Sequence, residues 1–422
     1  MSESSRTVSA IEDDPKAVFI TLLARELHRA GVASDQLQQT ITSAADALGL
    51  QVEILAFPTM IQIAIGPRYA QQIVVLRMTP GRVNLRKLSG INDTFDDLQN
   101  GKIDTSDAID YLRHIDQRTP MPAPLLSVAA LGMVAFGVAV ILGGGVNELI
   151  VAALIGLVTG VISVLAQRSP VVDRLFEVIA AFIATLIVAA YTHFIAPTNL
   201  YISIVAGVVV LLPGYSLTLA LNELANQDLI AGTARLGRVF AILLSLGCGA
   251  LLGFAVVGPH FLDAAAIVPH PVRSTFWIAA AIIMSLGLSI DLDARRRDLI
   301  WVFLACFVAL GASHVFGDLP IHQVAAFVSA FICGVVANLG ARFLRVPQPV
   351  FLVPALHVLV PGSLSYRSVL SIFSARYEDA GTLALNAIVV GILIVAGLLL
   401  SQLIFPSTTL RFHRGPYGSR PA

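Results

Sequence analysis

The chain has 422 residues, of which 56% are apolar and only 13% are charged, about half the charged share of an ordinary soluble protein. Its formal net charge is zero, so nothing suggests nucleic acid or another polyanion as a partner. Of the charged residues, 27 lie at or before Arg118, and the other 27 are spread over the remaining 304 residues. This division predicts a soluble domain followed by many membrane-spanning helices.

The first 15 residues are polar and acidic, and we expect them to be disordered. They lack a basic segment followed by an apolar run, which argues against a signal peptide and favours a cytoplasmic location for the soluble domain. The three cysteines, Cys248, Cys306 and Cys333, all lie in apolar segments. They are predicted to be small core residues, so we expect no disulfide, metal site or cofactor.

Residues 16–118 are predicted to form a small α+β domain, here called the head. Apolar residues at helical spacing predict helices at 16–30 and 34–48, ended by Gly31 and Gly49. Alternating apolar residues then predict strands, and two further helices follow, the second capped by Thr105 or Ser106. The predicted strands are 51–57, 59–66 and 69–78, and the later helices are 84–98 and 107–117. His28 and His114 are predicted to be solvated, and no catalytic constellation is evident.

Apolar runs of about 16–24 residues predict ten membrane spans. The first five belong to a segment at 119–260, the second five to a segment at 261–406, and a tail follows at 407–422. The predicted spans are 125–142, 148–167, 177–196, 200–222, 238–258, 275–290, 299–317, 322–341, 350–366 and 382–405.

The arginines between the spans predict the orientation. If the head is cytoplasmic and the loops alternate, twelve arginines after the head fall on the cytoplasmic side and three fall outside. Such a bias follows the positive-inside rule and predicts that both termini are cytoplasmic, in an inner membrane of the bacterial type.

Two segments in the membrane region resemble each other. The sequence IVAGVVVLLPGYSLTLAL at 204–221 is similar to FLVPALHVLVPGSLSYRSV at 351–369, and their prolines, Pro213 and Pro361, are 148 residues apart. These segments fall in the fourth and ninth spans, so the repeat unit is five spans. An odd number of spans inverts the second copy, and inverted repeats are typical of secondary transporters. We therefore expect a mainly α-helical protein with two inverted five-helix repeats behind the head.

Proline removes an amide donor from a helix, and freed backbone groups within a bilayer must be buried in protein or line a wet cavity. Broken helices at these positions would offer amide groups to an anionic substrate group and carbonyl groups to an ammonium. The alternative is that each Pro-Gly pair only kinks its helix for packing. The predicted substrate-binding or helix-break residues are Pro213, Gly214, Ser216, Thr218, Pro361, Gly362, Ser363 and Ser365.

Other polar residues in or beside spans are candidates for substrate contact or proton coupling because burying them is costly. For His357 a proton relay and a satisfied buried histidine are both open. The polar candidates are Asn222, Glu223, Asp228, Arg235, Asn338, His357 and Arg367. Two G-x-x-x-G pairs, Gly156–Gly160 and Gly249–Gly253, are predicted to allow close helix packing. No P-loop and no H-E-x-x-H motif occurs, which argues against a P-loop ATPase and a zinc protease.

Several stretches taken in order resemble the threonine/serine exporter family. In the head they are the helix end at Gly31, ALGL at 47–50, Pro58-Thr59, NLRKL at 84–88 and LQNGKID at 98–104. In the membrane region they are LLPGYSLTLALNELANQDLIAGTARLGR at 211–238 and LVPGSLSYRS at 359–368. The matching motif positions are Pro213, Gly214, Asp228, Gly232, Arg235, Pro361 and Gly362.

The resemblance implies export of threonine and serine from the cytoplasm, driven by protons, with both halves of the transporter fused in one chain. A homo-oligomer is compatible with this organisation. The open alternatives are a dicarboxylate exporter, a membrane-anchored hydrolase active in the head, and a head that serves as a regulatory or assembly domain.

Overall fold

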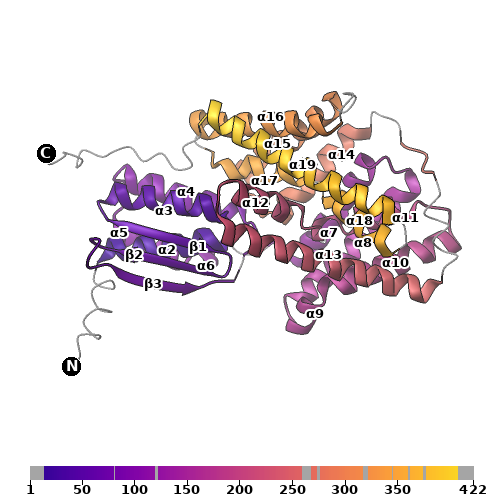
Figure 1. Cartoon of the computed structure of the whole chain (residues 1–422), viewed down its shortest axis with the longest axis horizontal. Helices are drawn as coiled ribbons and strands as arrows, with labels where there is room; N and C mark the ends of the chain where they lie inside the picture. Colours follow the sequence, from indigo (N-terminus) through magenta and orange to yellow (C-terminus); the bar gives the residue numbers. More distant parts are fainter. Residues whose placement is uncertain are drawn as a thin grey trace.

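The structure is a computed structural model that describes residues 14–79, 81–118, 122–258, 268–272, 276–316, 322–344, 346–359, 362–373 and 377–406. Pro361, most of the predicted disordered segment 1–15 and the whole of the tail 407–422 lie outside these residues. The head lies at one end of the long axis, and the apolar helices fill the remainder (Figure 1).

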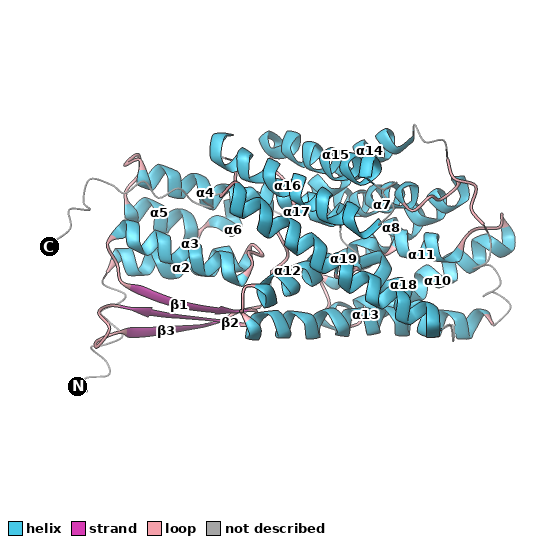
Figure 2. Cartoon of the chain, turned by 45° about the horizontal axis from the view of Figure 1, so that its top comes forward, coloured by secondary structure: helices cyan, strands magenta, loops and turns pink. Residues whose placement is uncertain are grey.

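The head is a three-stranded antiparallel sheet covered on one face by helices. Its helices all lie on the same side of the sheet, as Figure 2 shows. Ile61 and Ile63 of the central strand are fully buried beneath them, whereas Leu55 and Val75 lie exposed on the open face. The elements are α2 (Pro15–Arg29), α3 (Ser34–Leu48), β1 (Val52–Phe57), β2 (Met60–Ile65), β3 (Gln72–Arg77), α4 (Leu85–Gln99), α5 (Thr105–Arg113) and α6 (Ile115–Arg118).

Local chemistry sets the helix ends in the head. Gly49 adopts a left-handed conformation with φ 73° after α3, a position that favours glycine because it lacks a Cβ. The cap of α5 differs from the prediction: the carboxylate of Asp104, rather than Thr105 or Ser106, accepts a hydrogen bond from the amide of Asp107. The prediction for His28 was also wrong, because this side chain is only 7% exposed and its Nε2 bonds the carbonyl oxygen of Phe57 at 3.1 Å.

In the residues that the structure describes, the apolar region consists of helices joined by turns and loops. Eight of its segments, one of which covers residues 348–372, are long and apolar enough to cross a membrane, or nine if the bent pair within residues 200–225 is one span. The predicted total of ten and the inverted relation of the halves stay predictions, since Phe276–Asp291 has only 16 residues. The helices are α7 (Pro124–Ile141), α8 (Val146–Ala166), α9 (Pro170–Arg174), α10 (Phe176–Phe194), α11 (Leu200–Gly207), α12 (Gly214–Ala225), α13 (Leu229–Val257), α14 (Phe276–Asp291), α15 (Leu299–Phe316), α16 (His322–Leu344), α17 (Gln348–Leu359), α18 (Gly362–Phe373) and α19 (Tyr377–Ile404).

The two G-x-x-x-G pairs lie at close helix contacts, which confirms their predicted packing role. A Cβ added to Gly156 would lie 2.6 Å from the carbonyl oxygen of Leu131, so α7 and α8 approach at backbone distance. A Cβ added to Gly253 would lie 2.6 Å from Cβ of Thr185, where α13 crosses α10. Such close approach is available only to small residues.

Helices of the two halves of the helical region pack against each other. Helix α7 packs on α8 within the first half and on α14 of the second, while α13 of the first half packs on α18 of the second. The buried apolar residues of the head form one cluster with residues of α14 and α15, such as Met284 and Val302. A separate cluster joins α10, α12 and α13. The head therefore shares its core mainly with the second half.

Candidate functional site

The first Pro-Gly pair lies at a sharp break between α11 and α12. Helix α11 ends at Gly207, a short 3₁₀ turn covers Val209–Leu211, and α12 begins at Gly214 after a bend of 59°. Pro213 occupies the N-cap position and has no amide hydrogen to donate. No side chain caps α12, although Pro213 and Gly214 are buried. The first amides of α12 lack intrahelical acceptors and carry the positive end of the helix dipole.

The second Pro-Gly segment contacts the first at this point. The described residues of α17 run to Leu359 and those of α18 start at Gly362; positions 360 and 361 lie outside the described residues, and residues 348–372 together count as one candidate span. A Cβ added to Gly362 would lie 3.2 Å from Cα of Gly214 and 3.3 Å from Cβ of Leu212. The N-terminus of α12 thus contacts the backbone at Gly362. We call this contact the crossing.

Two aromatic rings lie beside the crossing. The ring of Tyr215 stacks on that of His357, with centroids 5.4 Å apart and planes 18° from parallel. The Nδ1 atom of His357 donates to the carbonyl oxygen of Val353 at 2.8 Å, since a carbonyl oxygen can only accept. This bond leaves Nε2 of the neutral ring as an acceptor.

Hydroxyl groups follow along the two helices that begin at the crossing. Thr218 is 1% exposed, and its Oγ1 has no hydrogen-bond partner among the described residues. It lies one turn after Gly214 on the same face of α12, and helical side chains lean toward the N-terminus of their helix. The Thr218 hydroxyl therefore lies over the start of α12. Ser216 and Ser363 are half-buried, and Ser365 is buried.

Two predicted polar residues lie away from the crossing. Asn338 of α16 accepts from Nε2 of Gln348 at 2.8 Å and donates to Ser401 at 3.5 Å, so it joins α16 to α17 and α19. Arg367 of α18 is exposed. Neither side chain contributes to the crossing.

The polar residues after the first Pro-Gly pair lie at the other end of α12. Glu223 is fully buried and forms a bidentate ion pair with Arg235 of α13, with nitrogen-to-oxygen distances of 2.8 and 2.9 Å. Because guanidinium and carboxylate are both planar, this double contact fixes the α12–α13 turn. Asp228 caps α13 by accepting from the amide of Ala231 at 3.4 Å.

The N-terminus of α3 packs against this turn. The amide of Ser34 donates to Oε1 of Glu223 at 3.3 Å. Oδ2 of Asp35 accepts from the side-chain amides of Asn222 and Asn226, both at 3.1 Å. Gln38 donates to Asp228 at 3.2 Å. The structure thus brings four predicted polar residues, Asn222, Glu223, Asp228 and Arg235, to one interface with the head.

Asp35 is an unusual carboxylate within this interface. Its Oδ1 is buried and accepts no hydrogen bond from the part of the chain that the structure describes. Burial raises the pKa of the Asp35 carboxyl, the nearby charge of Glu223 raises this pKa further, and the two asparagine amides oppose the shift. Burial also lowers the pKa of His28, on which the charge of Arg235 acts in the same direction.

A second contact between the head and the helices lies at the turn between α14 and α15, which sequence reasoning missed. The amides of Leu85 and Arg86, in the first turn of α4, donate to the carbonyl oxygens of Leu292 and Asp293 at 2.9 and 3.0 Å. The Arg86 guanidinium pairs with the Asp293 carboxylate at 2.9 Å. Buried Ser89 donates to Asp298 at 2.8 Å. The only sequence signal was the charged run DLDARRRD at 291–298 between two spans.

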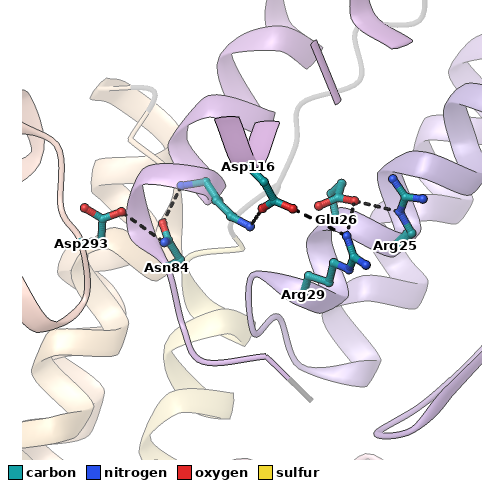
Figure 3. A network of polar contacts seen from close by, with 7 residues as sticks. Arg25, Glu26, Arg29, Asn84, Asp116 and Asp293 are labelled. Carbon is teal, nitrogen blue, oxygen red and sulfur yellow. Dashed lines mark hydrogen bonds and ion pairs between the residues drawn. The ribbon is translucent and has the colours of Figure 1, made fainter. Parts of the chain in front are cut away.

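A polar network extends from this second contact into the head (Figure 3). It begins where Asn84 donates to Asp293 at 3.2 Å. It continues through Lys87, Asp116, Arg29, Glu26 and Arg25, linking α4 and α6 to α2. The head therefore contacts the α14–α15 turn through a connected set of charged groups.

The head also has a cleft of about 590 Å³ between α4, α5 and the α14–α15 turn. Its lining includes four aspartates, Tyr111 and Arg295, and lacks cysteine, serine and histidine. This lining does not supply a nucleophile with a base, as a hydrolase of the serine or cysteine type requires. Among the described residues, no group of three histidine, cysteine or acidic side chains could hold a metal ion.

Comparisons with known proteins cover nearly the whole chain. A family model described as a putative threonine/serine exporter matches residues 18–257, and another, described as a threonine/serine exporter, matches residues 277–404. No solved structure matches.

Among curated proteins, similarity extends to fungi. An uncharacterized protein of Schizosaccharomyces pombe is 24% identical over 375 residues, which cover 85% of this chain and 45% of that protein. Pheromone-regulated membrane protein 10 of Pichia sorbitophila is 24% identical over 367 residues, 83% of this chain and 36% of the relative. The chain thus spans less than half the length of these two relatives.

Proposed function

The chain belongs to the threonine/serine exporter family, and on that premise we propose that it exports threonine and serine from the cytoplasm by alternating access, in exchange for protons. The substrate binds at the crossing, where the two Pro-Gly segments meet. The protein lies in the cytoplasmic membrane with the head and both termini on the cytoplasmic side.

One observation carries the location of the site: the start of α12, which no side chain of the described residues caps, is buried and lies against Gly362 of the second Pro-Gly segment. Amides and dipoles at helix N-termini favour a carboxylate. Helix α11 ends at Gly207, before the 3₁₀ turn that leads to this point, and carbonyl groups at a helix C-terminus favour an ammonium. A site with both kinds of helix end fits a zwitterionic amino acid better than a dicarboxylate.

The side chains beside the crossing suit a substrate hydroxyl. The unpartnered Oγ1 of Thr218 can donate to or accept from it, and Nε2 of His357 can accept. Arg235 lies at the far end of α12 and is already paired with Glu223, so it offers no free cation to a second carboxylate.

The test is efflux from cells loaded with a threonine- or serine-containing dipeptide, with and without the protein. The substitution Gly362→Val would force side-chain atoms into Gly214, and we expect efflux to fall by about tenfold or more. Gly237→Val is the matched control, because no atom of the described residues lies within 4 Å of a Cβ added at Gly237. If both variant proteins are present in the membrane in equal amounts and give equal efflux, the substrate does not bind at the crossing.

Thr218→Val tests substrate contact more finely. Valine keeps the shape of threonine and removes a hydroxyl without a partner among the described residues, so stability should be nearly unchanged. If the hydroxyl contacts the substrate, the KM for threonine rises by about tenfold, whereas an unchanged KM removes Thr218 from the site. The dicarboxylate alternative would be favoured if labelled succinate competed with threonine for export, or if succinate were exported and threonine were not.

A further inference from the structure

The two contacts between the head and the helices differ in kind. The α4 contact contains backbone hydrogen bonds from Leu85 and Arg86 to the α14–α15 turn, and the buried apolar core runs from the head into α14 and α15. The α3 contact joins the head to the α12–α13 turn through side chains and a single backbone amide, that of Ser34. The α4 contact is therefore part of an apolar core that continues from the head into the helical region, whereas the α3 contact is a polar contact between two surfaces.

The strongest interaction at the α3 contact survives removal of the head. Both partners of the Glu223–Arg235 ion pair belong to the helical region, so the buried carboxylate keeps its counter-ion when α3 leaves. The bonds that break are those that Ser34 and Gln38 donate and that Asp35 accepts, each between a neutral donor and a carboxylate, and water can replace them. The α3 contact can therefore open without leaving the buried carboxylate of Glu223 unpaired.

The α3 contact holds the helix that carries the candidate site. Helix α12 starts at Gly214 in the crossing and ends at Ala225 beside the contacts of Asp35. Twelve helical residues span about 18 Å, so α12 connects the crossing to the head as one rigid element. If the end of α12 near the head moves, the N-terminus of α12 at Gly214, which contacts Gly362, must also tilt or shift.

We propose that the head is a latch on α12: it is anchored to the second half through α4 and holds the first half through α3, and transport requires that α3 release the α12–α13 turn. This proposal rests on the proposed function, because it regulates the same crossing. It explains why a soluble domain contacts one turn from each half of the helical region.

Reversible cross-linking tests the latch. In a background with the three native cysteines replaced by alanine, Gln38→Cys and Asp228→Cys are joined by a short bis-methanethiosulfonate reagent and released by a reductant. We expect efflux to fall at least tenfold on cross-linking and to return on reduction. The matched pair is Asp93→Cys with Arg297→Cys, which are ion-paired at the α4 contact. Cross-linking this anchor should change efflux less than twofold.

Two results would overturn the latch. Efflux that persists after complete 38–228 cross-linking, verified by mass spectrometry, would show that α3 need not release the turn. Equal inhibition by the 93–297 cross-link would show that the two contacts do not differ as anchor and latch.

A distance measurement separates failure of the latch from failure of the proposed function, because it needs no substrate. Spin labels at exposed Gln39 and Ala234 report the α3 contact, and labels at exposed Asn100 and Arg296 report the α4 contact. In membrane vesicles the latch predicts two distances for the first pair and one for the second. One distance for both pairs would reject the latch, even in a protein that exports threonine.

Discussion

Removing one partner of the Glu223–Arg235 pair should destabilise the helical region strongly. Glu223 is fully buried and the Arg235 side chain is only 18% exposed, so Glu223→Leu leaves a largely enclosed guanidinium without its carboxylate. Breaking a buried pair in this way costs about 3–5 kcal/mol, and the partial exposure of Arg235 places the expected loss at the lower end. Arg235→Met should cost a similar amount, because it strands the buried carboxylate of Glu223.

The double variant should recover most of this loss. Replacing a buried ion pair by apolar side chains of similar size is often nearly neutral, so Glu223→Leu with Arg235→Met should lie within about 1–2 kcal/mol of the wild type. Unfolding in mixed micelles titrated with a denaturing detergent, followed by helical circular dichroism, measures the free energies. Arg238→Met is the control, as an exposed arginine on the same helix. A double-variant loss equal to the sum of the single losses would refute energetic coupling between these residues.

Two further predictions concern packing and pH. Gly253→Ala should destabilise the protein by about 1–3 kcal/mol in the same assay, because its Cβ would meet Thr185 at 2.6 Å, whereas Gly237→Ala should be nearly neutral. Docking of α3 should weaken as pH rises, because the pKa of Asp35 is raised above its ordinary value in the docked state, which therefore holds the proton more tightly. The weakening begins above the ordinary aspartate pKa of 3.8 and ends once pH exceeds the raised value; the spin-label pair across the α3 contact measures it. Asp35→Asn should abolish this response and Asp46→Asn, exposed on the same helix, should keep it.

Sequence periodicity predicted the elements of the head well because their signals are local. Helix α3 runs over the predicted residues 34–48, and Gly49 adopts the left-handed conformation that the sequence suggested. The three strands follow the alternation of apolar residues, with Ile61 and Ile63 buried under the helices. His28 was misjudged for the same reason: its neighbours in sequence are charged, but α2 turns its ring toward Phe57 on the sheet.

The contacts between the head and the helical region could not be predicted in this way. The amide of Ser34 and the carboxylate of Glu223 are 189 residues apart, and no local pattern encodes that they meet. The same holds for Ser89 and Asp298, 209 residues apart. Only the fold brings these partners together.

The structure divides the sequence motif at 211–238 into two parts with different surroundings. Its first part, from Pro213 to Thr218, lies at the crossing, where backbone and hydroxyl groups are available to a ligand. Its second part, from Asn222 to Arg235, satisfies its polar groups within the α12–α13 turn and against α3. Polar residues near a broken helix would ordinarily all be taken as substrate or proton contacts. Here the bonds already formed at the second part assign those residues to the head interface, and α12 connects that interface to the crossing.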